Sequence, residues 1–130
     1  MLVVDASALV DLLAGTARAA GVRQRMQQAD DLVAPELLMV ESSSALHRLV
    51  RARVLTGAEA DVAVRLMAAM PVRLVTHELL LGEAWRLRHA VRMADAFYLA
   101  CARRLDAPLL TSDARLARSG VPGVTVTLVT

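Results

Sequence analysis

Four carboxylates stand in apolar stretches of the chain, where a lone acid is costly. Burying one ionised carboxylate without a partner destabilises a fold by several kcal/mol. If all four converge, a divalent cation is needed to offset their mutual repulsion. The pattern therefore predicts a metal-dependent enzyme built on Asp5, Glu41, Asp95 and Asp113.

Two of these acids come at the ends of predicted strands. Asp5 directly follows the apolar run Leu2–Val4, and Asp113 follows the run Ala107–Thr111 after one serine. Ligands of open parallel sheets bind outside the carboxyl ends of the strands, so both side chains should face that crevice. Each could instead be only a helix N-cap, a common role for Asp before a helix. The residues alone leave both interpretations open.

The other two acids share helix faces with apolar residues. Glu41 lies in a predicted helix over 36–53, and its face carries Leu38, Ala45 and Leu49. Asp95 could cap a helix over 95–105, yet it shares a face with Tyr98 and Leu99 of that helix. An acid on an apolar face points inward. We therefore expect one mid-helix Glu and three strand-end Asp residues to form the site.

The candidate ligands are all oxygen donors, which suit Mg²⁺ or Mn²⁺. The single cysteine, Cys101, lies in an apolar stretch, and the histidines are scattered, so no zinc site is indicated. No serine stands in a setting typical of a catalytic nucleophile. Water is therefore the expected attacking group, while the number of ions and the identity of the general base stay open.

Composition excludes several enzyme classes. All 15 basic residues are arginine, which removes P-loop, Schiff-base and kinase chemistry, because each needs a lysine. One Trp, one Tyr and one Phe leave little surface for base stacking, so any nucleic acid would be held through Arg–phosphate contacts that salt weakens. One cysteine and no long apolar run favour a cytoplasmic protein.

Short β-type runs alternate with helical patterns along the 130 residues, which favours a single domain over 1–130. Continuous apolar strands separated by helices indicate a mostly parallel sheet covered on both faces. Strands are expected at 2–4, 31–34, 72–76, 107–111 and 124–129, the last at an edge. Helices are expected at 6–14, 16–29, 36–53, 56–70, 78–91 and 95–105, with a short turn after Asp113.

The segments VVDASALVDLL, PELLMVESSSAL and ADAFYLACARRLDAPLLTSDARL together resemble a PIN domain, specifically a VapC-type toxin of a toxin–antitoxin pair. The resemblance implies a three-layer α/β/α fold and an Mg²⁺- or Mn²⁺-dependent endoribonuclease. It also implies that the four acids are the catalytic and metal-binding residues. Ser7 and Thr111 match hydroxyl positions that steady such carboxylates. Arg115 and Arg118 are candidates for contacting RNA phosphate, and a merely solvated helix face is the alternative.

The resemblance further implies a small antitoxin partner, and we expect a homodimer. An apolar groove for a partner is expected from side chains in excess of what one sheet buries, although all of them could be core. They are Leu9, Leu12, Leu13, Met39, Leu46, Leu66, Met67 and Met70. A rival interpretation is a catalytically inactive PIN-like domain that binds RNA or protein. RNA and DNA substrates are not distinguished by these residues.

Overall fold

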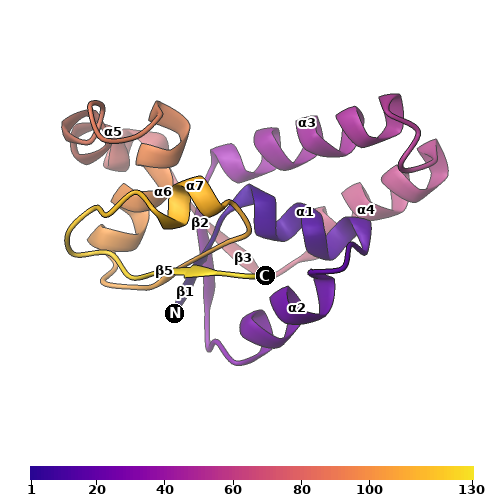
Figure 1. The fold of residues 1–130 in the computed structure, drawn as a ribbon, viewed down its shortest axis with the longest axis horizontal. Helices are drawn as coiled ribbons and strands as arrows, with labels where there is room; N and C mark the ends of the chain where they lie inside the picture. Colours follow the sequence, from indigo (N-terminus) through magenta and orange to yellow (C-terminus); the bar gives the residue numbers. More distant parts are fainter.

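A computed structural model describes residues 1–130 and shows a central sheet between two helical layers (Figure 1). All five strands are parallel, in the order β3-β2-β1-β4-β5. The α/β/α class and the final edge strand are therefore confirmed. The strands are β1 (Leu2–Val4), β2 (Leu32–Pro35), β3 (Val72–Val75), β4 (Leu109–Thr111) and β5 (Val126–Leu128).

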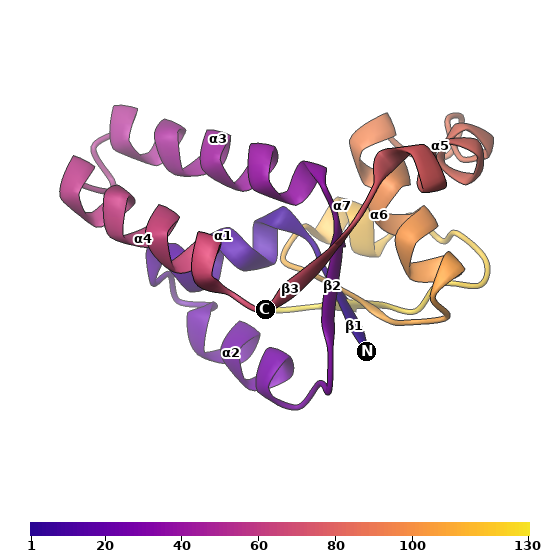
Figure 2. The same cartoon turned by 180° about the vertical axis from the view of Figure 1, so that it is seen from behind.

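Helices cover both faces of this sheet, as Figures 1 and 2 show from opposite sides. One side carries α1 (Ala6–Ala14), α2 (Ala19–Gln27), α3 (Leu37–Arg51) and α4 (Gly57–Ala69). The other side carries α5 (His77–Arg86) and α6 (Met93–Arg104), while α7 (Ala114–Ala117) is a single turn after β4. Since the strands are covered on both faces, their side chains are mostly apolar and buried, as in β1 and β4.

The strand order creates a reversal next to β1. From β1 the chain adds β2 and then β3 on one side, and it later returns to add β4 and β5 on the other. Val3 pairs with Val33 of β2 on one side and with Leu109 of β4 on the other. Such a reversal opens a crevice at the carboxyl ends of the two diverging strands. Asp5 and Asp113 follow β1 and β4 at that place.

Local signals explain most helix ends, with some differences. Thr56 and Glu59 form the expected capping box at the start of α4, each accepting the other's backbone N–H. The helix expected over 16–29 begins only at Ala19, and the Thr16 hydroxyl donates back to Asp11 instead of capping that helix. Pro35 ends β2 rather than opening a helix. The helix expected over 78–91 runs from His77 to Arg86.

The apolar groove expected from the sequence is mostly core. Leu9, Leu46 and Met67 are buried, and four more of the set pack partly buried against the core: Leu12, Leu13, Met39 and Met70. Only Leu66 of that set is exposed. The prediction failed because α3 and α4 both pack against α1. This helix–helix packing buries apolar surface in addition to that covered by one face of the sheet. None of the helices combines the length and apolar character needed to cross a membrane.

Candidate active site

A cleft of about 500 Å³ lies at the carboxyl ends of β1 and β4. All four acids predicted to form the site line this one cleft. They arrive from four separate segments: the β1–α1 junction, α3, the first turn of α6 and the β4–α7 junction. The structure thus brings together Asp5, Glu41, Asp95 and Asp113.

Asp5 stands at the N-cap position of α1, but its carboxylate does not cap the helix. Its Oδ2 instead accepts hydrogen bonds from Ser7 Oγ at 2.5 Å and from Thr111 Oγ1 at 2.7 Å. Burial raises the pKa of the Asp5 carboxyl, these two hydrogen bonds oppose the shift, and the charge of Asp95 adds to it. The capping interpretation is therefore wrong for Asp5, and its buried charge needs another partner.

Asp113 is the opposite case. Its Oδ1 accepts from the backbone N–H groups of Arg115, at 2.8 Å, and Leu116, at 3.4 Å, so it does cap α7. The Arg115 guanidinium also donates to Asp113 Oδ2 at 3.0 Å. Burial alone would raise the pKa of Asp113, but these hydrogen bonds outweigh it and leave the pKa lowered. Asp113 therefore caps a helix and lines the cleft at once.

Glu41 is half-buried on α3, one turn beyond the start of the helix. Burial raises the pKa of its carboxyl, the Tyr98 hydroxyl lowers it, and the charges of Asp5 and Asp95 raise it further. The Tyr98 hydroxyl is buried and has no hydrogen-bond partner of normal geometry, although it lies beside Glu41. Sequence reasoning placed Tyr98 only in the apolar face of α6 and so missed this contact.

The start of α3 is fixed by His77 of α5. Its Nε2 accepts the Leu37 backbone N–H at 2.8 Å. In return Glu36 Oε2 accepts the His77 backbone N–H at 3.4 Å, which links the first turns of two helices. The ring also packs against Phe97 at 4.8 Å between centroids. His77 therefore helps to hold the helix that carries Glu41.

Asp95 differs from its expected setting. It lies in the first turn of α6 rather than at a strand end, and Arg92, not Asp95, occupies the N-cap position. Asp95 is buried, and Arg92 contacts both of its oxygens, at 3.2 and 3.3 Å. Arg115 approaches Asp95 Oδ2 at 3.6 Å from the opposite side of the cleft. The strand-end prediction failed because the loop from 87 to 92 separates this acid from any strand.

Ser7 and Thr111 lie where the sequence placed them. Besides holding Asp5, the Thr111 hydroxyl accepts the Asp113 backbone N–H at 3.0 Å and lies 3.1 Å from Ser7 Oγ. Ser7 Oγ also accepts the Ser112 backbone N–H at 3.0 Å. The two hydroxyls thereby tie the β1–α1 junction to the β4–α7 junction. This network fixes two of the acids relative to each other.

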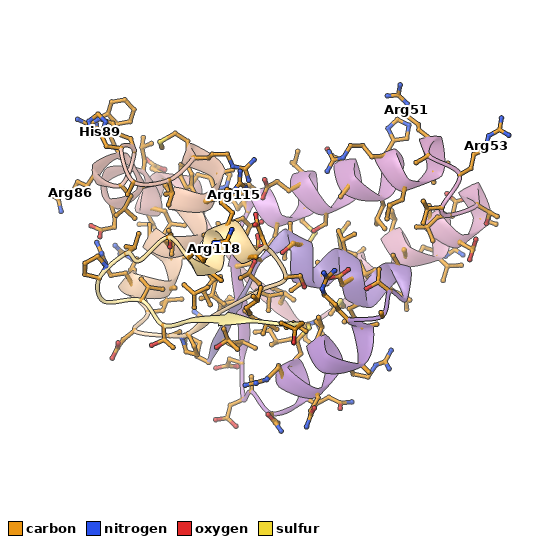
Figure 3. All side chains as sticks on the ribbon, in the orientation of Figure 1. Arg51, Arg53, Arg86, His89, Arg115 and Arg118 are labelled. Atoms are coloured by element: carbon orange, nitrogen blue, oxygen red, sulfur yellow. The ribbon has the colours of Figure 1, made fainter.

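The arginines divide into those that reach the cleft and those that do not. Arg115 reaches Asp95 and Asp113, whereas Arg118 is exposed and does not line the cleft. Figure 3 shows Arg115 on α7 and Arg118 just after it, far from Arg51 at the end of α3 and from Arg53 beyond that end. Sequence reasoning missed Asp11 and Arg18, which also line the cleft. It placed two further lining residues, Arg48 and Arg92, among arginines that mostly belong to solvated helix faces and of which only a fraction could line a phosphate groove. The four-residue spacing from Ser7 on α1 was the available signal for Asp11.

The donor atoms of the cleft are of the kind that a hard divalent cation binds. The candidate ligands are carboxylates only, and burial together with like charge raises the pKa of both Asp5 and Glu41. No three acids are close enough in this structure to share one ion. Arg92 and Arg115 meanwhile neutralise the charge of Asp95. The cleft therefore holds an excess of oxygen donors whose charge is only partly compensated.

Comparisons with known proteins bear on this cleft. The profile of the PIN domain family matches residues 2–121. Ribonuclease VapC3 of Mycobacterium tuberculosis is 42% identical over 118 residues, covering 90% of this chain and 85% of that protein. Ribonuclease VapC1 of the same organism is 39% identical over 122 residues, covering 92% of each. The crystal structure of Mycobacterium tuberculosis VapC20, a sarcin-ricin loop cleaving toxin, aligns with a TM-score of 0.72 and 20% identity, covering 96% of this chain and 99% of that one.

Proposed function

Because this chain belongs to the PIN domain family, with VapC ribonucleases among its relatives, we propose that it is a divalent-metal-dependent endoribonuclease. It acts as the toxin of a toxin–antitoxin pair in the cytoplasm. The observation that carries the proposal is the convergence of four acids from four segments on one cleft. The pKa values of Asp5 and Glu41 are raised, which indicates that their negative charges are unfavourable in the cleft unless a cation binds there.

In this proposal Asp5, Glu41, Asp95 and Asp113 hold Mg²⁺ or Mn²⁺. The chemistry such an ion supplies is activation of the attacking water and neutralisation of phosphate charge. We assign Ser7 a positioning role, because its hydroxyl donates to Asp5 and accepts the Ser112 backbone N–H. Cys101 is buried in the core, away from the cleft, and burial raises the pKa of its thiol to about 11. Water is therefore the attacking group.

The chain's own cations orient the RNA. Arg115 stands between two of the acids and is about half exposed, so its guanidinium can turn toward a phosphate oxygen. Arg92 is placed in the same way against Asp95. Of the two arginines first suggested by the sequence, only Arg115 lines up with this role, because Arg118 has no contact with the acids. If Arg92 and Arg115 bind phosphate in place of Asp95 and Asp113, these two acids become free to bind the cation.

Partner binding forms part of the proposal. The exposed apolar side chains gather on α4, with Val62 and Leu66, and on α5, with Leu81 and Trp85. Exposed apolar surface of this kind is typical of sites where another protein binds. We assign these faces to the antitoxin and to a second copy of the chain. They replace the groove expected from the sequence.

The proposal is tested with purified protein and total cellular RNA. Incubation with Mg²⁺, Mn²⁺ or a chelator, followed by mapping of the cut ends, should give discrete metal-dependent cleavage. Asp5→Asn should abolish cleavage, whereas Asp30→Asn, an exposed acid outside the cleft, should leave it intact. Cleavage that persists in the folded Asp5→Asn variant would contradict the assignment. Binding of RNA without cleavage by the native chain would favour the inactive regulatory domain instead.

A further inference from the structure

One arm of the cleft has no role in the proposed chemistry. It extends away from the four acids between α1 and α3, and it ends at residues that sequence reasoning did not select. Val10 and Ala45 form its apolar walls, and three charged side chains line it: Asp11, Arg18 and Arg48. An ion with one phosphate would fill only a small part of the 500 Å³ cavity. The arm is therefore room for a further part of a ligand.

Asp11 is a buried acid with one oxygen left without a hydrogen bond. Thr16 Oγ1 donates to Asp11 Oδ1 at 2.7 Å, while Asp11 Oδ2 is buried and has no hydrogen-bond donor. The nearest cation is Arg18, whose Nη1 lies 3.8 Å from Asp11 Oδ2. A buried carboxylate needs such a counter-charge. Asp11 therefore holds the Arg18 guanidinium at the edge of the arm, where half of that side chain remains exposed.

Arg48 is a cation without a partner. It makes no ion pair and no side-chain hydrogen bond, unlike Arg92 in the same cleft and Arg115, which contacts two of the cleft acids. It lies seven residues after Glu41 on the same face of α3, which is about 10 Å along the helix axis. A phosphate held at the four acids would be out of reach of the Arg48 side chain. A neighbouring phosphate of the same strand would be within its reach.

We propose that Arg48, together with the Arg18 that Asp11 holds, forms a subsite for the RNA phosphate next to the scissile one. The inference rests on the proposed function and adds a specific binding contact to it. Guanidinium groups bind phosphate oxygens through paired N–H donors, and two of them on opposite walls would clamp the backbone between α1 and α3. The arm carries no aromatic side chain, so the contact reads the backbone rather than a base.

RNA is favoured over an acidic peptide because the arm is continuous with the acid cleft. A strand whose scissile phosphate lies at the four acids must continue in some direction, and the arm leads directly from them. Recognition of a peptide is nevertheless a distinct outcome of the experiment.

The experiment measures binding of short single-stranded RNA of mixed sequence in the Asp5→Asn background, by fluorescence anisotropy at several salt concentrations. Arg48→Ala should weaken binding about tenfold and reduce the salt slope by about 0.7, the value for one phosphate contact on a single strand. Arg51→Ala is the matched control, since Arg51 is exposed on the same helix but outside the cleft. Asp11→Asn should give a smaller loss, through Arg18.

Cleavage kinetics provide a second readout with the otherwise native enzyme. Arg48→Ala should raise KM with little change in kcat, because the contact is the same in the ground and transition states. A salt slope and KM no different from those of Arg51→Ala would overturn the subsite. So would loss of binding to a protein partner with RNA binding unchanged. Failure of the proposed function is separate, because it appears in the unsubstituted chain as absence of RNA cleavage.

Discussion

Thr111 and Asp5 are joined by a buried hydrogen bond of 2.7 Å across 106 residues of sequence. The Thr111 hydroxyl donates to Asp5 and accepts the backbone N–H of Asp113, so one side chain connects two of the acids. Ser7 completes the connection by donating to the same oxygen of Asp5. The spacing of the two junctions therefore depends on two linked hydroxyls, of which that of Thr111 is fully buried.

Thr111→Val should damage both stability and cleavage. The substitution keeps the shape but leaves the Asp113 N–H without its acceptor and Asp5 with one donor fewer. We expect the free energy of unfolding to fall by about 1–3 kcal/mol, the usual effect of orphaning a buried polar group. Urea titration measures it. Thr127→Val on the edge strand β5 is the control and should leave cleavage unchanged, and equal losses in both variants would contradict the network.

Asp5→Asn should stabilise the metal-free protein. Asn keeps an oxygen to accept from Ser7 and Thr111 but removes the charge of Asp5, whose burial is unfavourable and raises the pKa of the carboxyl. We expect the melting temperature without metal to rise by about 3–5 °C, which corresponds to ~1 kcal/mol in a domain of this size. Calorimetry with chelator checks this.

The same pair of proteins tests for a bound cation. Mg²⁺ or Mn²⁺ should raise the melting temperature of the native chain by mass action. The increase should be small or absent in Asp5→Asn. An equal metal-induced increase in both proteins would place the ion elsewhere.

As the pH is lowered, the metal should be released at a higher pH than the pH at which the chain unfolds. The pKa values of Asp5 and Glu41 are raised, so both carboxylates begin to protonate above the ordinary carboxyl pKa of about 4. The protons then compete with the cation for these oxygens. For the metal-free protein, the raised pKa values mean that stability increases as the pH falls toward them. Asp113 has the opposite sign: its lowered pKa gives stability that is lost only as the pH falls through that lowered value.

Metal affinity measured by calorimetry across acidic pH checks the first part. Glu41→Gln should bind metal more weakly and should also lose one of the two protonations from the pH dependence. A metal affinity that does not change between neutral and mildly acidic pH would contradict the raised pKa values.

His77→Ala should weaken the start of α3. The Leu37 N–H loses its acceptor, so we expect about 1 kcal/mol of destabilisation, similar to the loss of a helix cap. Cleavage should fall as well, because Glu41 lies one turn further along that helix. His77→Gln, which retains an acceptor oxygen, should restore part of both. His89→Ala, at an exposed position on the outer edge of the molecule (Figure 3), should change neither.

The sequence was sufficient to predict the parallel sheet and that the four acids would converge, because both follow from local patterns. Apolar runs followed directly by Asp5 or Asp113 are visible within a few residues. The capping of Asp113 but not Asp5 was not predictable, since it depends on Thr111 arriving from a distant strand. The clamp of Arg92 on Asp95 depends on how the loop before α6 turns, and no residue pattern specifies that.

The surplus of apolar side chains shows a second limit of prediction from the sequence. Leu9 and Met67 have the same character in sequence as Leu66, yet two are buried and one is exposed. Whether each of these side chains is buried depends on how α1 and α4 pack against each other, which is a property of the tertiary structure. Hydrophobic pattern alone therefore indicated how much apolar surface exists but not where it faces.

The position of β1 in the middle of the sheet has a consequence for synthesis on the ribosome. β1, β2 and β3 are made first and are neighbours, whereas β4, which brings Thr111 and Asp113, pairs with β1 from more than a hundred residues away. A nascent chain that has not yet released β4 from the exit tunnel lacks one acid and the hydroxyl that orders another. We therefore expect the proposed ribonuclease activity to arise only once β4 has left the tunnel and paired with β1.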